Sequence, residues 1–350
     1  MQPKNVVLDI VKGMAILLVV AGHVIQRSMV VEGQDYFLNP LFKCIYMFHM
    51  PVFFFISGFL MAQSLKKRSL AEILKLRAGG LLVPFLSWGL LGMGTVFVLS
   101  GGHLNGRGIV DFFMDPAQLP VWFIWFLWTL FVSSFLLLVS VFLERWLGKF
   151  SFVAVFLVLL AMPLNSFLSF YYVKWFYLFY LAGYIVSVHG ESWVRALNNR
   201  VVFVAVVLAF AFLALHWTFN DYIYINQMRV GFTDGQEVLR IIYRYAAGFL
   251  GIAVLFFMAR YLSGKAAGRL LALLGVYSLD IYLVQRYLVE GVYPKILSWV
   301  PLRSDFNGPF FLAVVVPVLT VLLAMACLFL SRFLIRRNIW LNKLLLGNRV

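Results

Sequence analysis

The sequence predicts an all-α bundle that crosses a membrane about ten times and keeps both termini in the cytoplasm. First, 63% of the 350 residues are apolar, only 12% are charged, and the mean hydropathy is +0.93. A water-soluble protein of this composition would lack enough polar residues to cover its surface. Second, the apolar residues form runs that are similar in length to the about 20 residues that a helix needs to cross a bilayer. Third, basic residues are unequally divided between alternate loops.

The predicted spans follow one another as a single membrane domain, residues 1–350, without a sequence repeat or an appended soluble domain. Asp9 and Lys12 interrupt the first apolar run and no small-residue cleavage site follows it, so we expect a retained helix rather than a signal peptide. The ten spans are expected near residues 6–25, 41–62, 80–100, 121–143, 150–168, 171–188, 201–219, 241–261, 270–288 and 309–334.

The basic residues set the predicted orientation. Of the 29 lysine and arginine residues, 18 fall in segments on the same side as the N-terminus and ten on the opposite side, while Lys12 is embedded. Cytoplasmic loops of membrane proteins are enriched in these residues, so both termini are expected in the cytoplasm. In a membrane protein the excess over the 14 acidic residues therefore indicates orientation and not a nucleic-acid partner.

Three ionisable residues stand on one face of the first span. An ionisable group at mid-membrane costs about 2.5–3.5 kcal/mol on insertion scales, so such groups are functional candidates. His23 is expected within about 20° of Lys12 and 40° of Asp9 around the helix, and about 16 Å beyond Lys12 along its axis. That distance is comparable to an extended pantetheine arm. In the alternative interpretation, Asp9 and Lys12 are an interfacial i, i+3 pair and His23 is an interfacial histidine.

The second span contains a histidine next to a proline. Pro51 lacks an N–H group and frees the carbonyl of Met47 close to His49. Antiparallel packing of the first two spans is expected to bring His49 within one turn of the depth of His23, where the pair could supply a general base. Alternatively, His49 only stabilises the kink through a hydrogen bond to a freed carbonyl.

Weaker candidates lie along the remaining spans. Ser57 precedes a glycine, and Ser-Gly pairs are common where helices touch. Trp122 is at the external start of the fourth span, where an interfacial aromatic belt also accounts for it. Arg240 and Arg244 are one turn apart at the external start of the eighth span; they could bind an anionic acceptor or simply reach the interface. Tyr282 shares a polar face of the ninth span.

Two further features limit the chemistry. Asp280, near mid-depth in the ninth span, has no evident partner in the sequence. Cys44 and Cys327 are the two cysteines, and both lie in apolar runs, so neither a disulfide framework nor a thiolate metal site is expected. Nucleotide-binding and metal-hydrolase motifs are absent from the sequence, so no metal cofactor is expected.

Five motifs spread along the chain occur together. They are Leu8-Asp9-x-x-Lys12-Gly13-x-Ala15 with His23; Phe48-His49-Met50-Pro51 to Ser57-Gly58; Arg77 with Leu81-Leu82-Val83-Pro84 and Trp88; Trp122-Phe123; and Ser278-Leu279-x-Ile281-Tyr282-Leu283. This combination resembles the integral membrane acyltransferase 3 family, particularly fucose 4-O-acetylases and other polysaccharide acetyltransferases. The resemblance covers essentially the whole chain and implies ten spans in a bacterial plasma (inner) membrane.

The resemblance implies an O-acetyltransferase of polysaccharide biosynthesis. Acetyl-CoA or another acyl-CoA would enter from the cytoplasm, its phosphates held by Lys12, Arg77 and neighbouring cations such as Lys75, with Asp9 fixing Lys12. His23 would take the proton from a sugar hydroxyl while His49 orients it or stabilises the oxyanion; a route through an acyl-histidine is the alternative.

The acceptor would be a surface polysaccharide or a lipid-linked glycan met at the outer face, and the predicted substrate-binding residues are Arg240, Arg244, Trp122, Tyr282 and Ser57.

Two positions depart from the family pattern, and one other class of function competes. Gln285 stands where members often have a histidine, and only Arg77 stands clearly where they often have a pair of arginines. The competing interpretation is a transporter or flippase of a lipid-linked glycan, because intramembrane charges and a proline-broken helix also mark substrate pathways. A transporter is expected to contain related halves, and the sequence has none that we detect.

Overall fold

The computed structural model describes residues 5–99, 124–163, 170–190, 193, 199–222, 235–299 and 305–347, and every regular element in these ranges is helical. The chain divides into two compact units. Unit 1 comprises Met1–Phe53, Gly190–Asn226 and Gly231–Leu334, and unit 2 comprises Phe54–His189, Gln227–Val230 and Ile335–Val350. The helix α3 (His49–Leu65) begins in unit 1 and continues in unit 2.

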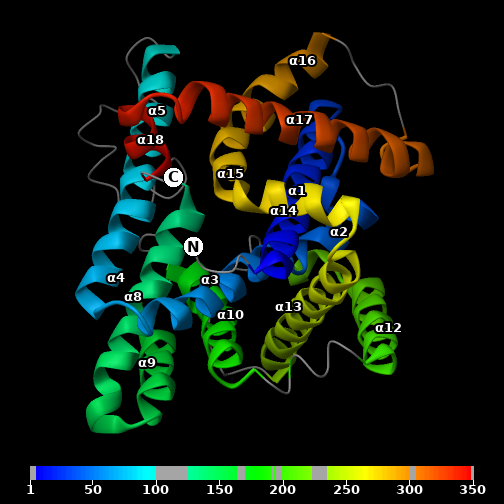
Figure 1. Cartoon of the computed structure of the whole chain (residues 1–350). Coiled ribbons are helices and arrows are strands. Elements are labelled where there is room, and N and C mark those ends of the chain that lie inside the picture. The colour runs from blue at the N-terminus through cyan, green and yellow to red at the C-terminus, as the bar shows by residue number, and fades with distance from the viewer. Residues whose placement is uncertain are drawn as a thin grey trace. The chain divides into compact units, whose positions relative to one another are not determined.

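Unit 1 is built around its first helix, which most of the other helices of the unit contact, whereas α12 packs on α13 (Figure 1). Three of its short elements, η5, η6 and η7, are π-helical turns, and η1 and η4 are 3₁₀ turns. Its elements are α1 (Val6–Val31), η1 (Tyr36–Leu38), α2 (Pro40–Tyr46), α12 (Arg200–His216), η4 (Phe219–Asp221), α13 (Gly235–Leu262), α14 (Ala266–Val276), α15 (Ser278–Tyr287), η5 (Leu288–Val292), α16 (Tyr293–Trp299), η6 (Phe311–Val315), α17 (Val316–Leu330) and η7 (Ser331–Ile335).

Helix α1 is apolar on most of its circumference, as expected of a helix buried among others. It begins after Asn5, whose side chain accepts a hydrogen bond from the Leu8 N–H at 3.4 Å. Its contact with α14 is especially close, because a Cβ atom on Gly13 or on Gly275 would collide with the backbone of the opposite helix. Glycines allow such backbone contact between membrane helices. Helix α1 is therefore held in a defined position beside α14.

The predicted second span is two helices with a short break. Helix α2 ends at Tyr46 and α3 begins at His49, so Pro51 stands in the first turn of α3, where a missing N–H costs little. Residues Pro40–Leu65 still form one apolar stretch of 26 residues that is long enough to cross a membrane. The proline therefore starts a helix and does not kink one in its middle.

The predicted ninth span, residues 270–288, corresponds to two helices with a sharp bend between them. Helices α14 and α15 meet at Tyr277 with a bend of 67°, and the helical chain then continues through η5 and α16 to Trp299. Helix α14 is held against α1, whereas the buried carboxylate of Asp280 on α15 accepts a hydrogen bond from Ser331 Oγ at 2.7 Å. The bond to Ser331 also supplies the partner that the sequence did not reveal for Asp280.

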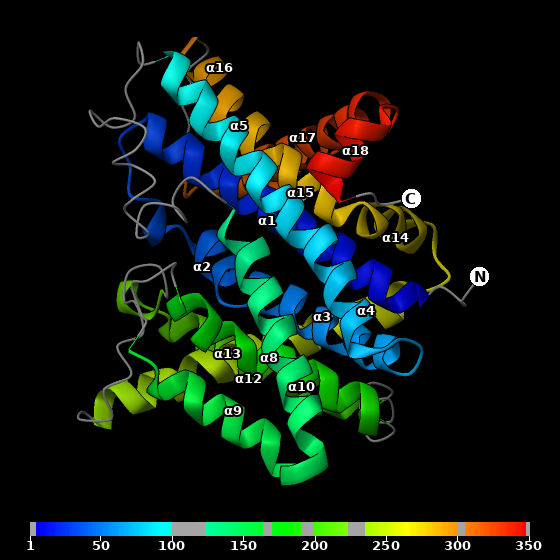
Figure 2. The ribbon, with the colours of Figure 1, turned by 90° about the vertical axis from the view of Figure 1, so that its left-hand side faces the viewer.

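Unit 2 contains a helical hairpin formed by α8 (Trp125–Leu147) and α9 (Phe150–Ala161). Figure 2 shows α8 and α9 side by side and antiparallel, joined by a turn at Gly148, whose φ is +55°. Lys174 donates to backbone carbonyls at the end of α9. The elements of unit 2, with the remainder of α3, are α4 (Leu70–Arg77), η2 (Ala78–Leu82), α5 (Val83–Leu99), α8 (Trp125–Leu147), α9 (Phe150–Ala161), α10 (Phe170–His189) and α18 (Ile339–Leu346).

In the ranges that the structure describes, the chain is all-helical and contains several candidate membrane spans, as predicted. Each of the ten predicted ranges overlaps a described helix. Among the described residues, six helices are long and apolar enough to cross a membrane, or seven if the bent pair counts as one span. Helix α9 has only 12 residues, about 18 Å of helix against a hydrocarbon core of about 30 Å. The count of ten spans and the cytoplasmic location of the termini therefore stay predictions, as does the single-domain boundary.

Candidate active site

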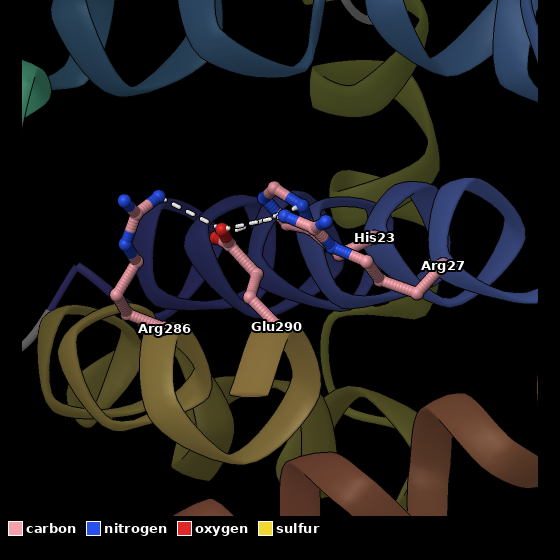
Figure 3. A network of polar contacts seen from close by, with 4 residues as sticks. All are labelled: His23, Arg27, Arg286 and Glu290. Atoms are coloured by element: carbon pink, nitrogen blue, oxygen red, sulfur yellow. Dashed lines mark hydrogen bonds and ion pairs between the residues drawn. The ribbon is translucent and has the colours of Figure 1, made fainter. Parts of the chain in front are cut away.

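His23 on α1 faces a carboxylate on η5. Its Nδ1 atom lies 3.8 Å from Glu290 Oε1. The other carboxylate oxygen, Oε2, accepts hydrogen bonds from Arg27 Nη2 at 3.1 Å and from Arg286 Nη1 at 2.8 Å. Figure 3 shows these four side chains converging between α1 and the α15–η5 segment. Two guanidinium groups thus anchor Glu290 through one oxygen and leave the other directed at the imidazole.

The spacing of the four residues explains this arrangement. Arg27 is one turn after His23 on α1, and Arg286 is one turn before Glu290, so each arginine shares a helix face with one member of the pair. Charge-assisted bonds from two guanidinium groups stabilise the negative charge of the carboxylate. A carboxylate beside an imidazole orients the ring and stabilises its protonated form when it accepts a proton. The cluster can therefore support general-base chemistry at His23.

Two polar atoms of this cluster have no hydrogen-bond partner. Among the buried side-chain atoms of the described residues, His23 Nδ1 and Arg27 Nε are unpaired. Unpaired buried polar atoms are rare and need an explanation. The separation of 3.8 Å between His23 and Glu290 is too long for a hydrogen bond, but catalytic hydrogen bonds often shorten only when substrate binds.

Glu290 was missed by the sequence argument because it lies two residues beyond the predicted end of the ninth span. The structure places it in the π-helical turn η5, and π turns within helices often occur at functional sites. A usable signal was present in the sequence. Arg286 and Glu290 are spaced i, i+4 within an apolar segment, as a helical ion pair would be.

The structure brings His49 to the same region as His23. The ring of Tyr46 has its centroid 4.7 Å from that of His49, and the same ring packs so closely on Gly22, the residue before His23, that a Cβ atom there would lie 2.8 Å from it. The two imidazoles are near enough to interact electrostatically. The prediction that both histidines lie at a similar depth in the membrane stays a prediction.

His49 also makes the hydrogen bond of the alternative interpretation, although to a different carbonyl from the one predicted. Its Nδ1 lies 2.8 Å from the carbonyl oxygen of Ile45 and not of Met47. A carbonyl only accepts, so Nδ1 carries the hydrogen and Nε2 has the free lone pair. This bond fixes the ring at the α2–α3 break. It is compatible with a supporting role beside His23.

Lys12 and Asp9 form the predicted i, i+3 ion pair, with Lys12 Nζ 2.7 Å from Asp9 Oδ1. On α1, Lys12 is eleven residues before His23 and Asp9 is fourteen before it, which corresponds to about 16 Å and about 21 Å of helix. Asp9 therefore holds the lysine and is too distant to serve His23. The three aligned ionisable residues of the first span belong to two separate clusters.

Unit 2 contains a cavity of about 220 Å³ with two arginines in its wall. Arg68 and Arg77 line it together with Ser64 and Gly80. Lys75, predicted as a second cation beside Arg77, is exposed and does not line the cavity. The second guanidinium comes instead from Arg68, at the end of the loop that precedes α4. The sequence pattern of two arginines before the third span does not identify Arg68, because Arg68 comes close to Arg77 only in the folded chain.

Arg240 and Arg244 have partners within unit 1. Arg244 is buried and donates from Nη2 to the backbone carbonyl of Asn220 at 2.6 Å, and Arg240 Nε lies 3.5 Å from Asp221 Oδ1. These contacts attach the segment after α12 to the start of α13. They give both arginines a structural role, while a role in acceptor binding stays a prediction.

Three predicted substrate-binding residues remain: Ser57, Tyr282 and Trp122. Ser57 is half-buried and adjacent to Gly58, which packs directly on the backbone of Tyr180, so the helix-contact interpretation accounts for the pair. Tyr282 is half-buried on α15. Trp122 lies outside the described residues.

Comparison with known proteins gives one family and two relatives. Residues 5–330 match the protein family described as "Acyltransferase domain". The chain is 28% identical over 289 residues to "Nodulation protein NolL" of Sinorhizobium fredii, a match that covers 81% of this chain and 77% of the relative. A protein with the same name from Mesorhizobium japonicum is 28% identical over 293 residues, covering 79% of this chain and 74% of the relative. No solved structure matches the chain.

Proposed function

The chain belongs to this acyltransferase family and is a membrane acyltransferase, and from that premise we propose that it transfers an acetyl or related acyl group from cytoplasmic acyl-CoA to a hydroxyl of a surface polysaccharide or lipid-linked glycan. The observation that carries the proposal is the His23–Glu290 pair, in which one carboxylate oxygen is held by two arginines and the other faces the imidazole. A hydroxyl becomes a competent nucleophile when a positioned base removes its proton.

The proposed reaction uses His23 first as a base and then as an acid. Its Nε2 atom takes the proton of the acceptor hydroxyl as that oxygen attacks the thioester carbonyl and forms the new ester bond. Glu290 stabilises the resulting imidazolium. When the carbon–sulfur bond breaks, His23 returns the proton to the departing sulfur, so CoA leaves as a thiol. His49, fixed by its bond to Ile45, orients the substrates or stabilises the oxyanion.

The donor side of the proposal rests on the remaining cations. Lys12, held by Asp9, and the Arg68–Arg77 cavity carry positive charge suited to the phosphates of acyl-CoA, and two guanidinium groups in one cavity suit phosphate recognition. With ten spans and a cytoplasmic N-terminus, Lys12 would lie toward the side that supplies the donor. His23 would then lie toward the side that presents the glycan, in a bacterial inner membrane.

A His23→Ala variant tests the enzyme against a flippase. Membrane abundance, surface-polysaccharide export and acetyl groups on the exported polysaccharide are measured in the same cells, with His216→Ala, at an exposed histidine, as the control. We expect acetylation to be lost in His23→Ala alone, with export intact. Loss of export while acetyl transfer from labelled acetyl-CoA persists would favour the flippase and reject the proposal.

The sidedness of the proposal has its own test. Labelled acetyl-CoA is supplied to inverted and to right-side-out membrane vesicles that contain the acceptor glycan. We expect acetyl transfer in the inverted vesicles, whose cytoplasmic face is exposed to the added donor. Transfer only from the external face would contradict the proposed orientation.

A further inference from the structure

We propose that Tyr293 is a positioning residue for the His23–Glu290 pair, which it aligns through a buried hydrogen bond to Ser28. This inference rests on the proposed function of the pair. The Tyr293 hydroxyl and Ser28 Oγ are 2.8 Å apart, and the two residues are 5% and 1% exposed. In this proposal the bond aligns the His23–Glu290 pair, which is a role separate from any contribution to the stability of the fold.

The bond joins the same two segments as the ion-pair cluster. Ser28 follows Arg27 directly on α1, and Tyr293 is three residues after Glu290, so both contacts link α1 to η5–α16. The ion pairs alone leave room for movement, because Arg27 and Arg286 are long side chains that are 32% and 45% exposed. The Ser28–Tyr293 bond is buried and involves a short side chain and a rigid ring. It therefore sets the spacing between the two backbones more firmly.

The π turn makes such an anchor necessary. Glu290 lies within η5, and Tyr293 is the first residue after that turn. The π-helix is rare and occurs mostly as single turns inside α-helices, so its persistence here depends on tertiary contacts. If the turn relaxed toward α geometry, Glu290 would rotate relative to Tyr293 and to α1. Anchoring Tyr293 to Ser28 opposes that rotation and keeps Oε1 directed at His23.

The decisive experiment combines Tyr293→Phe with Glu290→Gln in a double-mutant cycle. Tyr293→Phe keeps the ring and removes only the hydroxyl, and Ser28→Ala removes the other half of the bond. We expect each to lower kcat about tenfold, the effect of one hydrogen bond of about 1.4 kcal/mol, with KM for acetyl-CoA unchanged. In the Glu290→Gln background, Tyr293→Phe should have no further effect, because the carboxylate through which it acts is already gone. Tyr261→Phe, at an exposed tyrosine of α13, is the matched control.

The pH profile of kcat is a second readout that a purely structural role would not move. The charged or titratable groups that act on His23 are Glu290, Arg27, Arg286 and His49. Tyr293→Phe leaves all of them in place but should displace the profile in the same direction as Glu290→Gln, by a smaller amount. Activity is expressed per amount of folded protein in the membrane, measured for every variant.

Three results would overturn the inference. An equal loss of activity from Tyr293→Phe with and without Glu290 would show that the tyrosine acts independently of the carboxylate. Unchanged specific activity in both Tyr293→Phe and Ser28→Ala would show that the bond contributes only to folding or to nothing measurable. A changed kcat with an unmoved pH profile would separate Tyr293 from the imidazole. If His23→Ala and Glu290→Gln themselves keep full activity, the proposed function fails first and on its own.

Discussion

Replacing Glu290 with glutamine tests the proposed role of the His23–Glu290 pair most directly. The amide has nearly the shape of the carboxylate but no charge, so Arg27, Arg286 and an imidazolium at His23 would face one another without a counter-ion. Two unit charges about 4 Å apart interact by about 4 kcal/mol at an effective dielectric constant of 20, and the His23–Glu290 separation is 3.8 Å. Each 1.36 kcal/mol changes a rate tenfold, which sets an upper bound of about a thousandfold.

The expected effect is smaller than this bound. The imidazolium forms only partly in the transition state, and the His23 side chain is 21% exposed, so water screens part of the interaction. We therefore expect kcat to fall about a hundredfold. KM for acetyl-CoA should be unchanged, because Glu290 is not one of the residues proposed to bind the donor. The assay is transfer of labelled acetyl from acetyl-CoA to acceptor glycan in isolated membranes, normalised to the amount of protein.

A matched control separates the local charge from general electrostatics. Glu32 is exposed at the C-terminal end of the same helix, α1, and Glu32→Gln makes the same chemical change. We expect wild-type kinetics from it. If Glu290→Gln retained kcat within twofold of the wild type at normal abundance, the carboxylate would not assist His23 and the reasoning would be refuted.

Three further predictions concern other parts of the structure. Arg68→Gln should raise KM for acetyl-CoA about tenfold with little change in kcat, because one charge-assisted bond to phosphate is lost. Lys75→Gln, outside the cavity, should leave KM unchanged. If both variants raised KM equally when the rate is measured against acetyl-CoA concentration, the assignment of the cavity to the donor would be contradicted. Gly183→Val should destabilise unit 2 by about 1–3 kcal/mol, because its side chain would meet the backbone of α3; an unchanged melting temperature in detergent would be the contrary result. Ser331→Ala should cost about 1–3 kcal/mol by removing the hydrogen bond to buried Asp280, and full thermal stability would show that this bond is dispensable.

Much of the helical architecture could be predicted because hydropathy acts locally. A run of apolar residues long enough to cross a bilayer must form its backbone hydrogen bonds within itself, which makes a helix the expected structure. All ten predicted ranges accordingly overlap described helices. The Asp9–Lys12 pair was predictable for a similar reason, since residues three apart on one helix are neighbours whatever surrounds them.

Contacts between distant segments could not be predicted in this way. Glu290 is 267 positions after His23 in the sequence, and nothing in the spacing of either segment indicates that they meet. The bend at Tyr277 was not predicted either: α14 packs on α1 and α15 bonds to Ser331, and these contacts come from different parts of the chain. Hydropathy carries no information about which apolar faces pack together.

The sequence by itself determined that this protein is a helical membrane protein, that Lys12 and His23 share one face of its first helix, and that its motifs resemble those of membrane acyltransferases. Only the tertiary structure decided which groups serve that histidine. Packing of η5 against α1 supplies Glu290, and folding of the loop before α4 supplies Arg68 beside Arg77. Composition and periodicity record how each segment meets its solvent, whereas an active site depends on which segments meet each other.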